Sequence, residues 1–561
     1  MSSLGDTSAT FCATLVDEWV RLGVQHAVVA PGSRSTPLAV ALAARSEIAL
    51  HVFHDERSAS FAALGAALVS HVPSVLLCTS GTAAAHFHAA IIEADLSGVP
   101  MIVCTADRPP EMRDVGAPQT IDQVHLYGSS VRWFHDPGVP SDEAAHTWRS
   151  LASRAYSTSL GDTPGPVHLN LPFREPLLGK ASDLPPARSG GWSQRIRPVV
   201  ASLEGLETFA ELLSGRTGVL IAGKGSGREV LALAASLGWP VFADPVSGVR
   251  ECDPLVSTAF DPILRSTSFA DSHMPEVVLR IGAPPASKVL SQWVSRCGAD
   301  VVQICGTDVV IDPEHNVSFS LVGDVALLVR DIAARVKTCN SKWLEDWSRA
   351  ETAAQVAIGR WTDENMSEPT VARIVTAGLK VGSHFVVSSS MPIRDVEWFG
   401  TVTPGVTVHS NRGANGIDGV VSTAVGVALA SNAPVTLLIG DVAAIHDSNG
   451  LWALSRRGVN LTIVVTNNDG GSIFSFLPQA TQVETSTFEL LYGTPHGVSF
   501  EHLALAHGLA YHRVHTAEEL RAVLGTDGVR VIEVSLDRSV NVSQHIDVNE
   551  AVIQAVAAMG E

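Results

Sequence analysis

Oxygen ligands that suit a hard metal ion occur in two short segments of the C-terminal part of the chain. Asp441 directly follows the apolar run 435–440. Asn468 and Gly470 follow the next apolar run, 461–466. Carboxylate, amide and backbone carbonyl oxygens suit Mg²⁺, which completes its shell with water and substrate phosphate oxygens. Either segment alone is typical of a turn after a strand, whereas the two together indicate a metal site beside a diphosphate.

The elements around these segments are expected to bring them together. The two apolar runs predict strands, and residues 448–457 between them predict a helix. In a parallel strand–helix–strand unit, Asp441 and Asn468 leave neighbouring strands at the same carboxyl edge of the sheet, where ligands of α/β folds bind. The pattern therefore places the metal site at that edge.

Short β-branched runs alternate with Ala- and Leu-rich helical stretches along the whole chain, which predicts an α/β fold of doubly wound parallel sheets. The Pro-, Gly- and Ser-rich stretch 180–197 predicts a linker, and the charged stretch 337–360 predicts a helix that leads into a third region. Three domains follow, 1–185, 195–345 and 360–561, and the first and third are candidates for distant structural copies. The predicted strands are 26–30, 49–53, 75–79, 101–105 and 166–171 in the first region, 218–222, 241–243, 277–281 and 301–304 in the second, and 385–388, 407–410, 435–440, 461–466 and 529–535 in the third.

The composition fits a globular protein and excludes several classes. Of 561 residues, 46% are hydrophobic and 17% are charged, which disfavours a disordered, collagen-like or coiled-coil chain. A net charge of −19 disfavours a general nucleic-acid or anionic-membrane surface, so an anionic ligand requires arginines gathered in a pocket. The seven cysteines show no C-x-x-C spacing, and no signal peptide or membrane span stands out, which predicts a reducing, cytoplasmic location without membrane insertion.

A glycine-rich loop at 223–227 follows the predicted strand 218–222 and invites comparison with a dinucleotide-binding loop. Its spacing is G-x-G-x-G instead of G-x-G-x-x-G, and no acidic residue clearly stands at the ribose position. We therefore interpret this region as a vestigial nucleotide-binding fold without a working site.

Six further short sequence segments in the two outer regions indicate a family. They are residues 31–38 (PGSRSTPL), 55–57 (DER), 79–83 (TSGTA), 105–111 (TADRPPE), 410–419 (SNRGANGIDG) and 470–478 (GGSIFSFLP). With Asp441 and Asn468, they resemble the thiamine diphosphate (ThDP) enzymes and, more narrowly, the menaquinone-pathway synthase family MenD. Val442 departs from the ThDP motif, which has glycine there, but the metal ligands stay in place. The resemblance covers both outer domains, while the central region matches in layout only.

The resemblance implies a fold, cofactors and a reaction. The fold is the three-domain α/β fold of ThDP enzymes, and Mg²⁺, with Mn²⁺ as a substitute, anchors the cofactor. The implied enzyme is a transferase of the transketolase type, which would decarboxylate 2-oxoglutarate and add the succinyl carbanion to isochorismate in menaquinone biosynthesis. Each substrate carries more than one anionic group, and guanidinium groups bind carboxylates bidentately. A homodimer or homotetramer with active sites at the subunit interface is also implied.

The same resemblance implies roles for individual residues. Glu56 hydrogen-bonds the aminopyrimidine N1′ of ThDP, and Ile417 props the cofactor in its bent shape. The implied catalytic residues are Glu56, Arg394 and Arg412, and the implied metal ligands are Asp441, Asn468 and Gly470. The implied substrate-binding residues are Ser33, Arg34, Arg108, Gln119, Lys288, Ser390, Arg394 and Arg412. The implied cofactor-binding residues are Glu56, Ile417, Asp441, Asn468, Gly470, Ile473, Phe474 and Leu477, and the last three also wall the pocket against water. Pro118 stands where the family usually has asparagine, so no role is carried over to it.

Plainer interpretations compete with several of these roles. Glu56 alone is typical of an acidic residue at a helix N-terminus. Ser390 and Arg394 also fit a solvated helix start, and Lys288 fits a surface lysine. The hydrophobic residues that follow Gly470 also fit core packing. Two other functions stay open: another ThDP-dependent 2-oxo acid decarboxylase or acetolactate-type synthase, which does not explain so many arginines, and a non-catalytic ThDP-binding protein, against which Glu56 argues.

Overall fold

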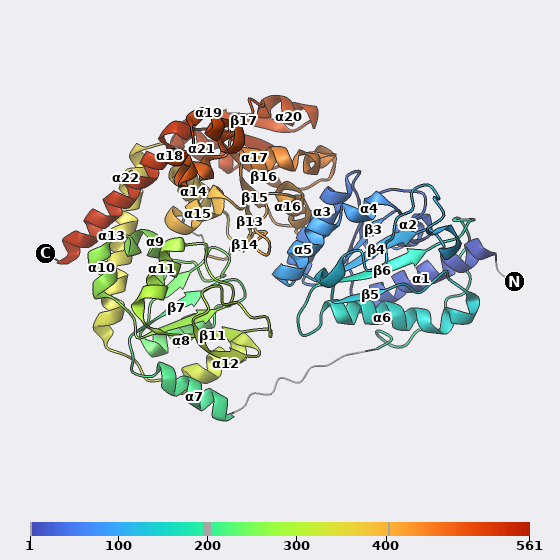
Figure 1. Cartoon of the computed structure of the whole chain (residues 1–561), viewed down its shortest axis with the longest axis horizontal. Coiled ribbons are helices and arrows are strands. Elements are labelled where there is room, and N and C mark those ends of the chain that lie inside the picture. The colour runs from blue at the N-terminus through green and yellow to red at the C-terminus, as the bar shows by residue number, and fades with distance from the viewer. Residues whose placement is uncertain (1–2, 194–202, 402–403, 561) are drawn as a thin grey trace. The chain divides into compact units, whose positions relative to one another are not determined.

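The computed structural model describes residues 3–193, 203–401 and 404–560. These residues form three six-stranded sheets with helices between the strands, and every strand pairing is parallel (Figure 1). The predicted class of parallel α/β sheets is therefore confirmed. Of the predicted linker, residues 180–193 form neither helix nor strand, while 194–197 lie outside the described residues, as do 195–202 of the predicted second domain.

The chain divides into two compact units. The first unit comprises 1–197, 411–432 and 443–459, and the second comprises 198–410, 433–442 and 460–561. The first unit holds one sheet, with strand order β2-β1-β3-β4-β6-β5. Its strands are β1 (His26–Val29), β2 (Ala49–Val52), β3 (Ser74–Cys78), β4 (Met101–Asp107), β5 (Trp133–His135) and β6 (Pro166–Pro172). Its helices are α1 (Leu4–Leu22), α2 (Thr36–Ala43), α3 (Glu56–Ser70), α4 (Thr82–Ala85), α5 (His88–Ser97), α6 (Trp148–Ser159) and α16 (Val420–Ala430), with short 3₁₀ helices at η1 (Pro110–Met112), η2 (Gly128–Ser130), η3 (Asp142–Thr147), η4 (Ser448–Leu451) and η5 (Leu454–Arg456).

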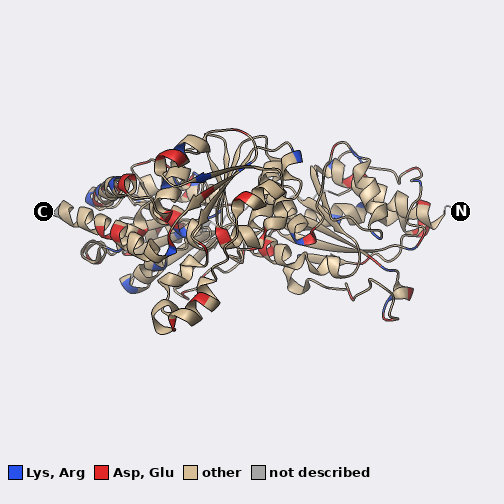
Figure 2. Ribbon diagram, turned by 90° about the horizontal axis from the view of Figure 1, so that it is seen from above, with Lys and Arg blue, Asp and Glu red and all other residues tan. Residues whose placement is uncertain are grey.

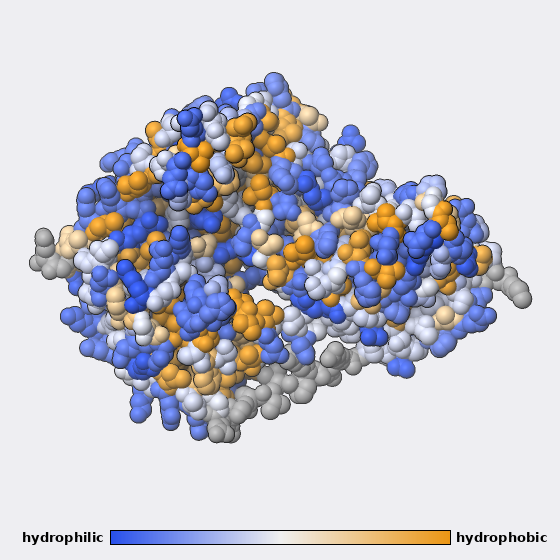
Figure 3. Space-filling model, viewed as in Figure 1, coloured by the Kyte–Doolittle hydropathy of each residue, from blue (hydrophilic) through white to orange (hydrophobic). Residues whose placement is uncertain are grey.

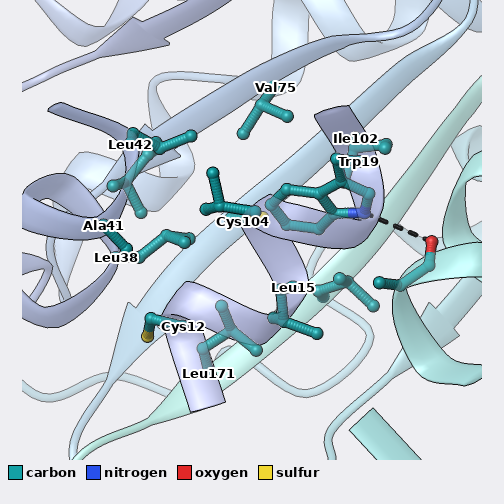
Figure 4. Close-up of a cluster of buried hydrophobic side chains, with 14 of the residues drawn as sticks. Cys12, Leu15, Trp19, Leu38, Ala41, Leu42, Val75, Ile102, Cys104 and Leu171 are labelled. Carbon is teal, nitrogen blue, oxygen red and sulfur yellow. Dashed lines mark hydrogen bonds between the residues drawn. The ribbon is translucent and has the colours of Figure 1, made fainter. Parts of the chain in front are cut away.

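The core of the first unit is built around α1, whose apolar face lies on the sheet. Leu15 and Trp19, one turn apart, are fully buried in a cluster with Ile102 and Leu171 (Figure 4). The indole nitrogen of Trp19 donates a 3.2 Å hydrogen bond to the Ala152 carbonyl of α6, so its polar atom is satisfied inside the core. Removing these side chains from water stabilises the unit by about 2–3 kcal/mol each.

Helix α16 belongs to the first unit because it packs closely against α3. A Cβ atom on Gly65 of α3 would lie 2.1 Å from the Thr423 carbonyl oxygen, and one on Gly426 of α16 would lie 2.1 Å from the Ala62 carbonyl oxygen. The two backbones are therefore in direct contact, and only glycine fits at this crossing.

The second unit holds two sheets. The central one has the order β12-β11-β10-β7-β8-β9, which is the 3-2-1-4-5-6 order of dinucleotide-binding folds. Its strands are β7 (Gly218–Ala222), β8 (Val241–Ala243), β9 (Val256–Ser257), β10 (Val277–Ile281), β11 (Asp300–Cys305) and β12 (Val317–Val322). Its helices are α7 (Leu203–Leu213), α8 (Val230–Leu237), α9 (Phe260–Leu264), α10 (Thr267–Ser272), α11 (Lys288–Cys297), α12 (Val325–Ala333) and α13 (Ser341–Glu364).

The glycine-rich loop 223–227 follows β7 at the point where this strand order reverses. A dinucleotide would enter there between the loops after β7 and β10. A Cβ atom on Gly223 would lie 1.5 Å from the Ala283 carbonyl oxygen, and one on Gly282 would lie 2.2 Å from that of Lys224. The two loops are thus in direct backbone contact at the position of such a crevice.

The third sheet has the order β14-β13-β15-β16-β18-β17, which repeats that of the first sheet position by position. This agrees with the interpretation of the outer regions as structural copies. Its strands are β13 (His384–Val387), β14 (Thr407–His409), β15 (Val435–Gly440), β16 (Leu461–Asn467), β17 (Ala510–Val514) and β18 (Arg530–Ser535). The remaining helices are α14 (Glu368–Ala377), α15 (Met391–Phe399), α17 (Asp441–His446), α18 (Gln479–Gln482), α19 (Thr485–Phe488), α20 (Phe500–Ala506), α21 (Ala517–Leu524) and α22 (Arg538–Ala557), with 3₁₀ turns at η6 (Ser472–Phe476) and η8 (Ala558–Gly560) and a π turn at η7 (Glu489–Gly493).

One predicted helix is wrong, and four strands were not predicted. The stretch 448–457 forms two short 3₁₀ helices instead of one helix, because Ala453 between them adopts a left-handed conformation with φ +57°. The strands that escaped prediction, β5, β9, β12 and β17, all lie at sheet edges. They are very short, or their side chains are largely exposed, so they lack the continuous apolar run of a central strand.

The described surface carries charges of both signs. Lys and Arg are interspersed with Asp and Glu along the helices and loops (Figure 2). On the face seen in Figure 3, hydrophobic residues gather in several patches between hydrophilic ones. No helix among the described residues is both long enough and apolar enough to span a bilayer.

Candidate active site

Asp441 and Asn468 meet at the carboxyl edge of the third sheet, as the sequence predicts. Gly440, the last residue of β15, pairs with Thr466 near the end of β16. The Asp441 carboxylate accepts hydrogen bonds from the backbone N–H groups of Asn468 and Gly470, both at 3.0 Å, through its Oδ2 atom. The loop after β16 is therefore folded onto the first residue of α17.

The side chain of Asn468 is hydrogen-bonded to a carboxylate that was not predicted from the sequence. Its Nδ2 donates a 2.7 Å hydrogen bond to Oε1 of Glu368, the first residue of α14. Its Oδ1 is buried and has no hydrogen-bond partner among the described residues. A buried, unpartnered amide oxygen near a buried carboxylate is the arrangement that a divalent cation satisfies. These residues therefore fit Mg²⁺.

The buried acidic groups around Asn468 have perturbed acidities. Burial raises the pKa of Asp441, because desolvation disfavours the carboxylate. Burial first, and then the neighbouring charge of Asp395, raise the pKa of Glu368 to about 7. Asp395 lies on α15 and contacts Nε2 of His545 at 2.7 Å. Asn468 is thus connected through Glu368 to the helix that carries Arg394.

Gly470 has a conformation and an environment that exclude a side chain. Its φ is +146°, and a Cβ atom there would lie 1.9 Å from the Gly493 carbonyl oxygen. The next residue, Gly471, donates a 2.9 Å backbone hydrogen bond to the same oxygen. The backbone of this loop can therefore approach a bound group closely, as a diphosphate requires.

The hydrophobic residues after this loop lie on and beside the short helix η6. Ile473 and Phe474 are half-buried, and Leu477 is 41% exposed. The ring of Phe474 lies 5.5 Å from that of Tyr492. None of the three is a fully buried core residue, so each leaves part of its apolar surface uncovered by the protein.

Ser390 and Arg394 lie at the start of α15, as predicted. Ser390 precedes the helix with φ +75° and ψ −134°, a conformation that costs a non-glycine residue about 1–3 kcal/mol. Nη1 of Arg394 donates a 2.6 Å hydrogen bond to the Ser390 carbonyl oxygen. Strain of this kind persists where the surrounding structure enforces it, and it concentrates at functional sites.

Lys288 is the first residue of α11 and is exposed. The preceding Ser287 caps this helix by accepting a 2.9 Å hydrogen bond from the Leu290 N–H. The position of Lys288 is thus defined by its backbone, while its side chain extends into solvent.

Glu56 is the first residue of α3 in the first unit. Burial, and then the negative charge of Glu56, raise the pKa of the Cys78 thiol, which places the Glu56 carboxylate near the carboxyl end of β3. Asp55 caps the helix and accepts a 2.6 Å hydrogen bond from Nδ2 of Asn449. The start of α3 is therefore anchored, and Glu56 extends from a fixed point.

Arg34 and Arg108 lie near each other in the first unit. Burial, and then the positive charge of Arg108, lower the pKa of Arg34. Arg34 is only 4% exposed and donates a 2.9 Å hydrogen bond to the Phe173 carbonyl oxygen. Ser33 beside it is exposed. Two guanidinium groups in one place are what a substrate with several anionic groups requires.

Gln119 has a left-handed backbone with φ +55°, and its Nε2 donates a 3.1 Å hydrogen bond to the Ser80 carbonyl oxygen. The Ser80 hydroxyl donates in return to the Gln119 carbonyl oxygen. Pro118, which cannot supply a side-chain amide, precedes this turn and is exposed. Gln119 is therefore held next to the string TSGTA.

The loop that carries Arg412 and Ile417 is held by a second carboxylate that sequence reasoning missed. Glu93 of α5 accepts hydrogen bonds from the backbone N–H groups of Gly413 at 2.9 Å and Ala414 at 2.7 Å. Both Arg412 and Ile417 are half-buried. The available signal was an acidic residue inside the apolar run AAIIEADL, which is unusual unless the residue has a buried partner.

All the predicted site residues lie in the described part of the chain, and they are divided between the two units. The first unit holds Ser33, Arg34, Glu56, Arg108, Gln119, Arg412 and Ile417. The second holds Lys288, Ser390, Arg394, Asp441, Asn468, Gly470, Ile473, Phe474 and Leu477.

Comparison with known proteins assigns these parts to one family. Residues 10–126, 193–386 and 399–534 match the N-terminal TPP binding domain, the middle domain and the C-terminal TPP binding domain of thiamine pyrophosphate enzymes. The 2-succinyl-5-enolpyruvyl-6-hydroxy-3-cyclohexene-1-carboxylate synthase of Thermobifida fusca (strain YX) is 43% identical over 98% of this chain and 99% of its own length. The chain belongs to this synthase family. The synthase of Myxococcus xanthus (strain DK1622) is 41% identical over 97% of both chains.

Membership of the synthase family confirms the resemblance seen in the sequence. Glu56 falls in the match to the N-terminal TPP binding domain, and Asp441 and Asn468 fall in the match to the C-terminal one. Benzoylformate decarboxylase from Polynucleobacter necessarius shares the fold with a TM-score of 0.74, over 94% of this chain and 98% of its own. Its sequence is only 19% identical, so this likeness concerns the fold alone.

Proposed function

We propose that the protein is a ThDP- and Mg²⁺-dependent carboligase of menaquinone biosynthesis. It decarboxylates 2-oxoglutarate and adds the succinyl unit to isochorismate, which forms 2-succinyl-5-enolpyruvyl-6-hydroxy-3-cyclohexene-1-carboxylate. The observation that carries the proposal is the similarity to synthases of this name over 98% of the chain. The Asp441–Asn468 edge of the third sheet supports it, because its carboxylate and amide oxygens suit the metal ion that the cofactor needs.

Asp441, Asn468 and the carbonyl oxygen of Gly470 would hold Mg²⁺, for which Mn²⁺ would substitute. When bound, ThDP supplies a nucleophilic carbon and accepts the negative charge left by departing CO₂. Glu56 would hold a proton at N1′ of the aminopyrimidine ring. Ile417 would be the apolar support for the cofactor.

The remaining residues of the site bind and shield the substrates. Arginine and lysine side chains would pair with the carboxylates, with Arg394 and Arg412 closest to the reacting atoms. Ile473, Phe474 and Leu477 would exclude water, which protects a reactive carbon from protonation. The substrate-binding set is Ser33, Arg34, Arg108, Gln119, Lys288, Ser390, Arg394 and Arg412.

The organisation that we propose has three domains, 1–185, 195–345 and 360–561, in a cytoplasmic homodimer or homotetramer. Active sites would lie at the subunit interface. Size-exclusion chromatography with light scattering measures the assembly, and a mixture of inactive Glu56 and Asp441 variants tests the shared site. Recovery of activity on mixing supports a site built from two subunits.

The decisive experiment for the reaction is product analysis by mass spectrometry. Purified protein is incubated with ThDP, Mg²⁺, 2-oxoglutarate and isochorismate, and each component is left out in turn. An adduct that carries the succinyl unit and requires all four is expected. Release of CO₂ from a different 2-oxo acid without this adduct would instead favour a decarboxylase or an acetolactate-type synthase, and no turnover at all would favour a binding protein.

A further inference from the structure

The C-terminal end of α15 is bound by a buried arginine from the central sheet region. Nη2 of Arg250 lies 2.9 Å from the Val396 carbonyl oxygen, 2.8 Å from that of Glu397 and 2.9 Å from that of Gly400. Nη1 of Arg250 donates a 2.9 Å hydrogen bond to the Ala243 carbonyl oxygen at the end of β8. Arg250 therefore joins the central sheet to the helix that begins next to Ser390.

A helix end is a favourable place for this cation. The last carbonyl groups of a helix have no intrahelical partner and carry the negative end of the helix dipole. Arg250 is only 3% exposed, and burial lowers its pKa to about 10, so it stays charged at neutral pH. Its planar guanidinium reaches carbonyl groups on two elements at once, which a lysine ammonium cannot do in the same geometry.

The same helix end also holds the segment that leads to Lys288. Oε2 of Glu397 accepts a 2.7 Å hydrogen bond from the backbone N–H of Ala286. Two residues later, Lys288 begins α11, with Ser287 as its cap. Glu397 thus connects the start of α11 to α15, and Arg250 holds the backbone of Glu397.

The opposite end of α15 requires this support. Ser390 adopts φ +75°, which side-chain-bearing residues rarely do, and it directly precedes the helix. A helix that is free to shift or rotate would let Ser390 relax to an ordinary conformation. A helix whose C-terminal end is bound through Val396, Glu397 and Gly400 does not have that freedom.

We propose that Arg250 is a positioning residue for the substrate pocket. It fixes α15 against the central sheet and, through Glu397, sets the position of Lys288 relative to Ser390 and Arg394. Arg250 does not touch a substrate in this proposal. The inference rests on the proposed roles of Ser390, Arg394 and Lys288 in binding substrate carboxylates.

The test compares Arg250→Lys with wild type in the full-length enzyme. The expected result is a fall in kcat/KM of about 10- to 100-fold, with a raised KM for at least one of the two substrates, because small displacements of positioned groups are costly. ThDP and Mg²⁺ affinity by calorimetry is expected to change less than KM, since, among the described residues, Arg250 contacts neither Asp441 nor Asn468, and α15 reaches Asn468 only through Asp395 and Glu368. A purely structural role would lower stability and the active fraction but leave both KM values unchanged, which would overturn the proposal.

The matched control is Arg149→Lys. Arg149 is also a buried arginine, but it lies in the first unit and pairs with Asp17 at 2.8 Å and Glu18 at 2.9 Å. Both KM values should be unchanged in this variant. If Arg250→Lys does not fold, Glu397→Ala and Glu397→Gln carry the test. The alanine variant should have a raised KM. The glutamine variant keeps an acceptor for the Ala286 N–H, so its KM should be close to that of wild type. Equal KM values for both variants and wild type would overturn the proposal.

Arg394→Lys, measured alongside, distinguishes loss of the positioning role of Arg250 from loss of the proposed binding role of α15. If Arg394→Lys leaves KM unchanged, the proposed binding role of α15 fails. If Arg394→Lys raises KM while Arg250→Lys does not, only the positioning inference fails.

Discussion

The Glu368 carboxylate accepts a 2.7 Å hydrogen bond from Nδ2 of Asn468, which directs the amide oxygen of Asn468 away from Glu368. That oxygen is buried and has no other partner among the described residues. An asparagine amide can turn by half a rotation, and one orientation would present an N–H group to a cation. Glu368 therefore selects the orientation in which Asn468 can bind a metal.

Glu368→Leu is expected to weaken Mg²⁺ binding about 10- to 100-fold in the presence of ThDP, because Asn468 loses the acceptor that orients it. Glu368→Gln should retain most of the affinity, since its amide oxygen can accept the same hydrogen bond. Calorimetric titration of Mg²⁺ measures both. Equal affinity of the leucine variant and wild type would contradict the orienting role.

Asp441→Ala is expected to weaken the retention of Mg²⁺ and ThDP, because a ligand and a compensating charge are lost together. Cofactor affinity by calorimetry measures this. Asp547→Ala, which removes an exposed aspartate from α22, is the control and should bind as wild type does. Unchanged affinity in Asp441→Ala would exclude the proposed metal site.

Glu56→Gln is expected to abolish carboligation while largely preserving ThDP binding, because the amide cannot exchange a proton with the aminopyrimidine N1′. Product formation and cofactor affinity are measured on the same preparation. Glu143→Gln, an exposed glutamate of the first unit, is the control and should keep full activity. Undiminished carboligation in Glu56→Gln would remove Glu56 from the mechanism.

Asp447 should make the stability of the first unit depend on pH. Burial raises its pKa to about 6, against an ordinary 3.8, so the folded state holds its proton more tightly than the unfolded state does. The free energy of unfolding therefore falls as pH rises from about 4 to about 6. Above that range the total loss is about 3 kcal/mol.

Asp447→Asn removes this titration and keeps an acceptor for the Ser422 backbone N–H, which Asp447 binds at 2.6 Å. The stability of the variant relative to wild type should rise between pH 4 and 6 and then level off. Urea unfolding at several pH values measures the difference. Parallel curves for the two proteins would show that Asp447 does not titrate in this range.

Gly426→Ala is expected to destabilise the first unit by about 1–3 kcal/mol, because the added methyl group would overlap the Ala62 carbonyl of α3. Thermal unfolding measures the loss. Gly525→Ala is the control, since a Cβ atom there meets nothing within 4 Å. A Gly426→Ala variant as stable as this control would mean that α3 and α16 are not in backbone contact.

Much of the architecture could be predicted because it is encoded locally. The central strands are continuous apolar runs, so 218–222, 241–243, 277–281 and 435–440 match the structure residue for residue. Edge strands such as β12 and β17 were missed, because their partly exposed side chains carry no such run. The helix predicted over 448–457 does not form, because Ala453 has a left-handed backbone. The sequence did not indicate this break, because the position holds neither glycine nor asparagine.

The sequence alone determined the parallel α/β class, the family resemblance and the identity of the residues proposed for the site. Each of these depends on residue types within a few positions of one another, such as Asp441 after a strand and Asn468 after the next. Only the tertiary structure decided what holds those residues in place. Glu368 contacts Asn468, which is 100 residues away along the chain. Glu93 contacts the loop after Arg412, 320 residues away. Arg250 contacts the end of α15, about 150 residues away. A local pattern can mark such a residue as buried, as for Glu93, but it does not identify the partner, because a buried carboxylate or guanidinium is stabilised by groups that folding brings to it.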